Sequence, residues 1–146
     1  MRVWPNDLDT NAHMNNGRYL TLMDLGRFDL MTQCGLVGVV LRQRWFPIAG
    51  GVMVRFERPL HAFEKITLKS SILGWDDKWL YFRHDILTGD TRAARATTRG
   101  LFRTRGQSVP TADLLDAMNY DGAPMPPPDS VRQWVRADEL MRGEDE

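Results

Sequence analysis

Apolar and polar positions follow two different periods along this chain, and the first period is helical. From about Asn15 to Cys34 apolar residues recur every three or four positions, which predicts one long helix. Asn15 or Asn16 suits the N-cap, and Gly35 suits the C-terminal stop. The apolar stripe is wide, so we expect neighbouring elements to cover much of this helix. Gly26 lies inside it and predicts the close approach of one neighbour.

After this helix the period changes to two, which is typical of strands. Residues 76–77 and 89–90 form short turns between consecutive runs, which favours antiparallel pairing. One long helix and a meander of about five or six strands give an α+β fold. The predicted strands cover residues 1–4, 37–45, 50–58, 64–75, 78–87 and 91–105. Small residues on one face of the last strand would let a helix lie close to the sheet: Ala94, Ala96, Thr98 and Gly100.

The last part of the chain differs in character from the strand-rich part. Residues 109–118 predict a short helix, residues 124–128 a stiff proline-rich linker, and residues 130–142 an amphipathic helix. Residues 144–146 are acidic, and we expect them to form a solvated tail. We therefore divide the chain into a core domain, residues 1–118, and a linker with a C-terminal helix and tail, residues 119–146.

Composition places the chain among ordinary globular proteins. Its 146 residues are 42% apolar and 26% charged, which fits one domain with a proper core. The formal net charge is zero, and this disfavours general attraction to nucleic acid or to an anionic membrane. The single cysteine, Cys34, excludes an intramolecular disulfide and fits a reducing compartment. We find no membrane-spanning run and no signal-peptide pattern, and we expect a cytoplasmic protein.

The residues that carry chemistry concentrate just before the long helix. Asp9, Asn11 and His13 fall at alternate positions, so in an extended segment their side chains would share one face. The helix start adds unpaired backbone N–H groups and the positive end of a helix dipole. A base, an orienting amide, an imidazole and such donors are the parts that acyl transfer or hydrolysis requires.

The motif around these residues resembles a known active-site signature. Asp9-x-Asn11-x-His13-x-Asn15-Asn16-x-x-Tyr19 is similar to the signature of hotdog-fold thioesterases, of the 4-hydroxybenzoyl-CoA thioesterase-like and acyl-ACP thioesterase kinds. The resemblance covers roughly residues 3–115. Residues 6–11 and the turn at 75–78 resemble more narrowly the thioesterase superfamily member 6-like branch. The resemblance implies a hotdog fold, in which an antiparallel sheet wraps round one long central helix.

The resemblance also implies roles for the residues of the motif. Asp9 would be the general base or the nucleophile, Asn11 would position the water or the thioester, and His13 would polarise the carbonyl or pair with these groups. Backbone amides near the helix start would bind the oxyanion. An alternative assignment makes His13 the base and Asp9 the residue that orients it. The implied substrate-binding residues are Asn15, Asn16, Gly17 and Tyr19.

Plain structural interpretations exist for several of these residues. Asp9 and Asn11 also suit a turn, and Asn15 and Asn16 suit helix caps. Tyr19 begins the apolar stripe and also suits core packing. Some members of the family carry an additional acidic residue, and the residues available for this role here are Asp24, Asp29, Glu57 and Glu64.

The implied reaction sets expectations for cofactors and partners. No cofactor is expected, because coenzyme A is part of the substrate, and no pair of histidines or cysteines has metal-ligand spacing. The resemblance implies a homodimer or a dimer of dimers, with each site at an interface for which residues 45–47 and 50–53 are candidates. An acyl group on acyl carrier protein is the alternative substrate. A non-catalytic module that binds acyl groups or serves as a scaffold is the alternative function.

Arginines and two further histidines lie outside the motif. We predict that His84, on a face with apolar residues, is a satisfied core histidine and that His61 lies in a solvated turn. Arginine suits phosphate contacts, so one arginine cluster could hold the nucleotide end of coenzyme A. The alternative is a solvated outer face. The arginines concerned are Arg55, Arg58, Arg95, Arg99, Arg103 and Arg105.

Overall fold

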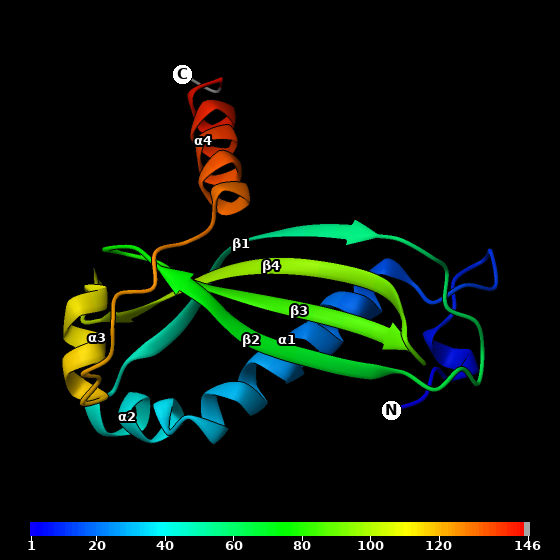
Figure 1. Ribbon diagram of the computed structural model, residues 1–146, viewed down its shortest axis with the longest axis horizontal. Coiled ribbons are helices and arrows are strands. Elements are labelled where there is room, and N and C mark those ends of the chain that lie inside the picture. The colour runs from blue at the N-terminus through cyan, green and yellow to red at the C-terminus, as the bar shows by residue number, and fades with distance from the viewer. Residues whose placement is uncertain (145–146) are drawn as a thin grey trace.

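The computed structural model describes residues 1–144 and has one antiparallel sheet with helices on both of its faces (Figure 1). The sheet is five-stranded and has the order β1-β4-β3-β2, with a short β5 paired to β4. The predicted α+β hotdog architecture is confirmed. The strands are β1 (Phe46–Phe56), β2 (Thr67–Trp75), β3 (Leu80–Thr88), β4 (Thr91–Thr104) and β5 (Gln107–Ser108). The helices are α1 (Asn16–Gln33), α2 (Leu36–Gln43), α3 (Thr111–Ala117) and α4 (Asp129–Gly143), preceded by a short 3-10 turn, η1 (Pro5–Asp7).

The long helix α1 crosses one face of the sheet, behind the strands in Figure 1. A Cβ atom at Gly26 would overlap the side chains of Ser70 and Leu68 on β2. On β4 the side chains Ala94 and Ala96 are buried in the core cluster that also contains Tyr19 and Met23 of α1. The close approach predicted from Gly26 is therefore confirmed.

Apolar side chains gather in two clusters along α1. The cluster at the start of α1 packs Tyr19 and Met23 against Met14 and Leu60, beneath the N-terminal loop. The cluster at its end contains Met31 together with buried residues of α2, β3, β4 and α3: Leu36, Val40, Leu80, Phe82, Phe102 and Leu114. The first cluster gives the N-terminal loop a rigid base.

Residues 37–45 were predicted to form a strand, and this prediction is wrong because most of them form α2. Gly35 adopts a left-handed backbone with φ of 80°, so it ends α1 and starts a second helix. Leu36, Val39 and Val40 are then buried at helical spacing. Burial on the second cluster outweighs the weak strand preference of the valines.

The two outer edges of the sheet also differ from the prediction. β1 begins at Phe46, earlier than the predicted residue 50. Residues 1–3 pair with residues 63–66, through backbone hydrogen bonds of Met1 and Val3 and a bridge between Arg2 and Lys65, but they do not extend into a regular strand. Pro5 has no backbone N–H, and η1 starts there and ends the pairing.

Coverage of α1 is one-sided, whereas neighbours were expected to cover much of it. Leu20, Leu25 and Phe28 are exposed in the single chain, Phe28 by 61%. The sheet covers only the side of α1 that carries Gly26 and Met23, because a single sheet meets only one stripe of a helix. Cys34, at the C-cap of α1, is exposed as well.

The C-terminal helix α4 is fixed to the outer face of the sheet, the face turned away from α1. The guanidinium of Arg99 on β4 lies 4.7 Å from the ring centroid of Trp79 and 5.3 Å from that of Trp134. The same guanidinium donates to the carboxylate of Asp138 at 2.5 Å. From this anchor α4 projects past β1 (Figure 1).

The linker before α4 is packed against the end of β2. The backbone N–H of Trp75 donates to the carbonyl of Met125 at 2.9 Å. A Cβ at Gly74, where φ is 148°, would meet the carbonyl oxygen of Met125, so the linker needs a glycine there. The predicted C-terminal helix is confirmed, and of the predicted tail Glu144 caps α4. Residues 145–146 lie outside the described residues.

Candidate active site

The loop that carries the sequence motif is a closed turn, so the condition under which alternate side chains would share one face, an extended segment, is not met. Leu8 and Met14 form an isolated antiparallel bridge, and the N–H of Asp9 donates to the carbonyl of His13 at 2.8 Å. Ala12 has φ of 58°, and this left-handed residue lets the chain reverse. The short spacing between the bridged residues forces the reversal. The side chains of Asp9, Asn11 and His13 line one cavity because the loop folds back on itself, and strand alternation plays no part.

The carboxylate of Asp9 does two things in this loop. Its Oδ1 accepts the backbone N–H of Asn11 at 2.8 Å and that of His13 at 3.4 Å, which is an Asx-turn arrangement. Its Oδ2 has no hydrogen-bond partner among the described residues, and Asp9 is half-buried. The turn interpretation of Asp9 is thus correct for one oxygen and leaves the second oxygen available for chemistry.

Asp7 anchors the loop to the start of α1. The side chain of Asp7 is buried, accepts the N–H of Trp4 at 2.8 Å and pairs with Arg18 at 2.7 Å. Its carbonyl accepts the N–H of Asn15 at 2.8 Å. Both carboxylate oxygens of Asp7 are therefore engaged in structure, in contrast to those of Asp9.

The start of α1 has most of its backbone donors already satisfied. The side chain of Asn15 accepts the N–H of Gly17 at 2.7 Å, which confirms Asn15 as the N-cap. The N–H of Arg18 donates to the carbonyl of Asn15 at 2.9 Å. Within residues 1–144 the N–H of Asn16 has no such partner. Among the backbone amides of residues 15–17, only that of Asn16 is free to bind a ligand in the single chain.

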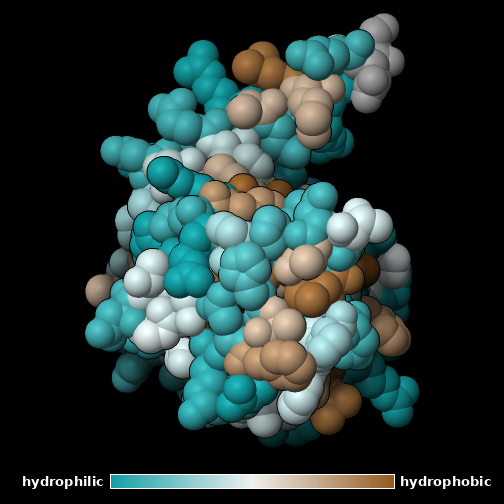
Figure 2. Space-filling model, turned by 90° about the vertical axis from the view of Figure 1, so that its right-hand side faces the viewer, coloured by the Kyte–Doolittle hydropathy of each residue, from teal (hydrophilic) through white to brown (hydrophobic). Residues whose placement is uncertain are grey.

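A cavity of about 390 Å³ brings the motif together with the end of β1. The motif contributes Asp9, Asn11, His13, Met14, Asn16 and Tyr19, and the later segment contributes Phe56, Glu57, Arg58 and Pro59. Asn15 and Gly17 do not line it, because their polar groups face each other in the cap. Tyr19 belongs mainly to the core and meets Phe56 edge-on at 5.1 Å. Figure 2 looks at this end of the molecule, where hydrophobic patches lie among hydrophilic ones.

The loop after β1 supplies a second histidine that sequence reasoning assigned only to a solvated turn. His61 is exposed, but its ring lies edge-on to that of His13, with centroids 4.9 Å apart. The N–H of Met14 donates to the carbonyl of Leu60 at 2.8 Å and fixes the two loops side by side. No local signal could reveal this contact, because the two histidines are far apart in the chain.

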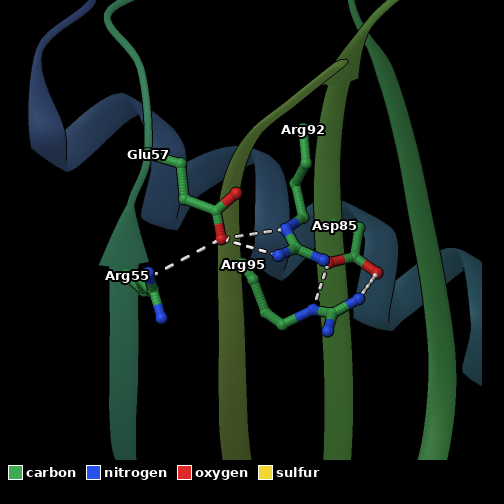
Figure 3. A network of polar contacts seen from close by, with 5 residues as sticks. All are labelled: Arg55, Glu57, Asp85, Arg92 and Arg95. Atoms are coloured by element: carbon green, nitrogen blue, oxygen red, sulfur yellow. Dashed lines mark hydrogen bonds and ion pairs between the residues drawn. The ribbon is translucent and has the colours of Figure 1, made fainter. Parts of the chain in front are cut away.

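Glu57 is the acidic residue, of the four available, that reaches the cavity. Its Oε1 accepts two hydrogen bonds from Arg92, at 3.0 and 2.7 Å, and lies 3.7 Å from Arg55 (Figure 3). Its hydrogen bonds with Arg92 hold the pKa of the Glu57 carboxyl below its usual range. Next to it, Asp85 binds Arg95 through two hydrogen bonds of 2.6 and 2.9 Å. Glu57 is therefore a fixed anion at the rim.

Apart from Arg58, the histidine and arginines discussed next lie away from this cavity. His84 is fully buried, and hydrogen bonds join its ring to Ser70 at 2.8 Å and to Thr98 at 3.3 Å, which confirms a satisfied core histidine. Arg95 and Arg99 each bind a carboxylate on the outer face. No group of three or more His, Cys, Asp or Glu side chains in residues 1–144 is placed to hold a metal ion. In the same residues, no helix has the length and apolar character needed to span a membrane.

Comparison with protein families decides where this chain belongs. The family model described as the thioesterase-like superfamily matches residues 3–135. The chain belongs to the thioesterase-like superfamily. The THEM6 protein of Drosophila melanogaster is 27% identical to it over 131 residues, which cover 88% of this chain and 65% of that protein. The chain spans only 38% to 50% of three further curated relatives that it matches.

Solved structures agree with the fold. YbaW, a probable thioesterase from Escherichia coli, has a TM-score of 0.73 at 16% identity, over 81% of this chain and 92% of that one. A gentisyl-coenzyme A thioesterase has a TM-score of 0.70 at 16% identity, over 80% and 96% of the two chains. At such identities these matches establish the fold, and the chemistry of this superfamily member has to be argued from its own residues.

Proposed function

We propose that this superfamily member hydrolyses the thioester of an acyl-CoA in the cavity at the start of α1. The observation that carries the proposal is the divided role of Asp9, whose Oδ1 closes the turn while Oδ2 is unpartnered among the described residues. Asn16, at the N-terminus of α1, lines the same cavity, and its N–H has no partner among residues 1–144. A base and an oxyanion donor at one cavity are the minimum that thioester hydrolysis needs.

In the proposed reaction Asp9 acts as general base towards water, or as nucleophile towards the carbonyl carbon. As a base, Oδ2 accepts a proton from the water that attacks the thioester. As a nucleophile, the same oxygen forms an anhydride that water then hydrolyses. In both cases the coenzyme A thiolate leaves and is protonated. Oδ1 stays with its two backbone donors, so the carboxylate keeps its orientation throughout.

The developing oxyanion needs donors that are in place before reaction. The N–H of Asn16 is free, and the α1 dipole adds favourable charge there. The side chains of Asn11 and His13 line the same cavity and supply further donors for the water or the carbonyl. Loss of one such donor typically costs about 3 kcal/mol of transition-state stabilisation. No cofactor or metal ion takes part in this proposal.

A role for His13 as the base is less well supported by the geometry. Asp9 bonds to the backbone N–H and carbonyl of His13, through its carboxylate and its own N–H, and the ring of His13 packs against His61. Within residues 1–144 no hydrogen bond joins the Asp9 carboxylate to the His13 ring. A carboxylate that orients an imidazole base would need such a bond.

The exposed edge strand β1 supports a homodimer as the working form. β1 pairs with β4 on one side only, and sheet edges of this kind readily pair with another chain. Its exposed apolar side chains are Phe46, Ile48, Val52, Met53 and Phe56. Pairing of two β1 edges would join the sheets of two copies and cover these side chains. Phe56 and Glu57 line the cavity, so each site would then lie at the interface.

Acyl-CoA is the substrate class that we favour over an acyl carrier protein. One protein with a similar fold is a gentisyl-coenzyme A thioesterase, which supports a coenzyme A thioester. An acyl carrier protein is acidic and would need a basic rim around the cavity. The rim arginines Arg58 and Arg92 are already paired with Glu64 and Glu57, which lowers their attraction for such a partner.

Release of thiol from short, long and aromatic acyl-CoAs tests the proposal. Asp9→Asn is the sharpest variant, because an asparagine Oδ1 can still accept the two backbone N–H groups and keep the turn. We expect kcat to fall about 10²-fold or more while the unfolding midpoint is unchanged. Asp90→Asn, in the exposed β3–β4 turn, is the matched control.

The other outcomes separate the alternatives. Full turnover in Asp9→Asn would move the base to His13. Binding of acyl-CoA without turnover in the native protein would indicate a non-catalytic module. Turnover only with an acyl carrier protein as substrate would replace the substrate class and leave the role of Asp9 to be tested on that substrate.

A further inference from the structure

His61 lies beside the candidate active site, and the proposed reaction does not use it. Its ring meets that of His13 edge-on, with centroids 4.9 Å apart and an angle of 76° between the ring planes. His13 lines the cavity together with Asp9, whereas His61 does not line it. Any effect of His61 on the cavity must therefore pass through the ring of His13.

The loop around His61 is held by backbone groups and by neighbouring side chains. The carbonyl of the buried Leu60 accepts the N–H of Met14 at 2.8 Å. The N–H of His61 donates to Oε1 of Glu64 at 3.1 Å, and Arg58 donates to both oxygens of that carboxylate, at 3.1 and 3.0 Å. These contacts fix the backbone of His61 next to the motif loop.

The imidazole of His61 takes no part in holding this loop. No hydrogen bond or ion pair within residues 1–144 involves its ring nitrogens, and the residue is exposed. An exposed side chain without polar contacts adds little to stability. Its one ring contact in the same part of the chain is with His13. The side chain is thus available for a role other than folding.

The ring of His13 also lacks a hydrogen-bond partner within residues 1–144. The last torsion of a histidine side chain is soft, so a ring without hydrogen bonds turns readily unless packing holds it. The backbone of His13 is fixed, because its carbonyl accepts the N–H of Asp9 at 2.8 Å. The edge-on contact with His61 therefore restrains the torsion that remains.

The orientation of the His13 ring matters because two partners compete for its N–H. The proposed reaction uses this group as a donor to the water or the carbonyl. The unpartnered Oδ2 of Asp9 lines the same cavity and is a strong acceptor for an imidazole N–H. A ring that turned to Oδ2 would occupy the oxygen that acts as base and would withdraw the donor from the substrate. Donors contribute to catalysis only while they are held in place.

We propose that His61 is a positioning residue, which holds the ring of His13 by edge-on packing and so keeps His13 a donor to the substrate and Oδ2 of Asp9 free. This inference rests on the proposed function. The contact joins the positive edge of one ring to the negative face of the other. It needs an aromatic ring at position 61, and no nitrogen atom of that ring takes part in a hydrogen bond.

Replacement of His61 by alanine and by phenylalanine tests the ring contact. His61→Ala should lower kcat for an acyl-CoA about 10-fold and leave KM within about twofold, because the substrate contacts remain and the donor is misplaced. His61→Phe should restore most of the native kcat, since phenylalanine keeps an aromatic ring there. Phe63→Ala, which removes another exposed ring from the same loop, is the matched control and should keep the native kcat. Unchanged kcat in His61→Ala, or equal losses with alanine and phenylalanine, would overturn the proposal.

A double-mutant cycle tests whether His61 acts through His13. His13→Ala should lower kcat by at least as much as His61→Ala. The combined variant should be no slower than His13→Ala alone, because a positioning residue then has nothing left to position. Losses that multiply in the combined variant would show that His61 acts on the reaction by another route, and the assignment would be wrong.

Thermal unfolding separates positioning from a structural role. His61→Ala should unfold at the native midpoint, since the side chain that it removes is exposed. A lowered midpoint that accompanies the loss of kcat would make His61 a structural residue and contradict the proposal.

Magnetic resonance of the imidazole groups adds a measurement that needs no turnover. The chain has three histidines, and His84 is buried and bonded to Ser70, so its signals serve as an internal reference. The ring of His61 should displace the ring-proton signals of His13 from their free-histidine positions. His61→Ala should return them towards those positions, and His61→Phe should keep them displaced.

This spectrum reports the ring contact even if no thioester is hydrolysed, so failure of the proposed function remains distinguishable. Unchanged His13 signals in His61→Ala would show that His61 does not hold the ring, and the proposal would fall whatever the turnover.

Discussion

The two faces of the sheet keep their polar side chains in different ways. On the inner face His84 is fully buried under α1, and its partners are the hydroxyl groups of Ser70 and Thr98. On the outer face Arg95 and Arg99 each bind a carboxylate directly. The inner face thus uses a neutral hydrogen-bonded side chain, and the outer face uses charge pairs.

Burial explains this difference. A charged group in the dry space between α1 and the sheet loses its hydration, and the apolar surroundings there offer nothing in its place. Burial, helped by the nearby charge of Arg27, lowers the pKa of His84 to about 4. On the wetter outer face, hydrogen bonds from Arg95 lower the pKa of Asp85 and keep both groups charged. The two faces should therefore respond differently to pH and to mutation.

The largest effect is expected from protonation of His84. Its pKa is about 4 in the folded chain and 6.5 in a free histidine, so the unfolded chain binds the extra proton first. Stability is unaffected above pH 6.5 and falls as the pH drops from 6.5 to 4, by about 3 kcal/mol in all. Urea unfolding at several pH values measures this slope. His84→Gln should lack it, and equal slopes in both proteins would contradict the assignment.

A large side chain at Gly26 should disrupt the same inner face. Gly26→Leu would overlap Ser70 and Leu68, and we expect a loss of about 2 kcal/mol of unfolding free energy. Gly38→Leu on α2 is the control, because the nearest atom to a Cβ at position 38, on the Arg42 guanidinium, would be 3.9 Å away. Thermal unfolding of both variants measures the difference. Similar losses at both positions would show that α1 is not closely packed on β2.

Breaking the Arg99–Asp138 pair should release α4 from the outer face. Asp138→Asn leaves the buried guanidinium without its anion, with an expected local loss of about 1.5 kcal/mol. The linker, residues 119–128, should then be cut faster by protease, while the sheet unfolds at its native midpoint. Asp129→Asn, which removes an exposed carboxylate from the start of α4, should leave the cleavage rate unchanged. Unaltered cleavage of Asp138→Asn would mean that the tryptophan contacts alone fix α4.

The smallest effect is expected from the more exposed Asp85–Arg95 pair. Asp85→Asn should lower stability by about 0.5 kcal/mol near neutral pH, since water screens the pair. The Asp85 contribution is present above its ordinary pKa of 3.8 and is lost only as the pH falls through its lowered folded value. This range lies below that of His84. A difference that persists unchanged in 1 M salt would contradict a screened pair.

The sequence predicted α1 and four of the strands because their apolar periods are long and regular. The strand predicted for residues 37–45 is wrong. Valines favour strands locally, but here they pack into the second core cluster from the helix α2. Residues 1–3 do pair with residues 63–66, through backbone hydrogen bonds of Met1 and Val3, but the paired stretch is too short to form a regular strand.

The candidate site was foreseen only on its α1 side. Asp9, Asn11 and His13 were selected by residue type and spacing, and all three line one cavity. The geometry behind the spacing was different, since a closed turn brings them together. Glu57 was one of four acidic residues among which the sequence could not choose, and His61 was predicted to lie in a solvated turn. Glu57 lines the cavity and His61 contacts the ring of His13, both through the pairing of distant segments, which residue spacing cannot reveal.

By itself the sequence determined the helix, the meander and the chemical motif, because each depends on residues close together in the chain. Only the tertiary structure decided which Asp9 oxygen is free, which helix amide remains available and which ring meets that of His13. Those answers depend on hydrogen bonds and ring contacts, several of them between segments far apart in sequence. Such pairing is fixed by packing of the whole chain, and no local period records it.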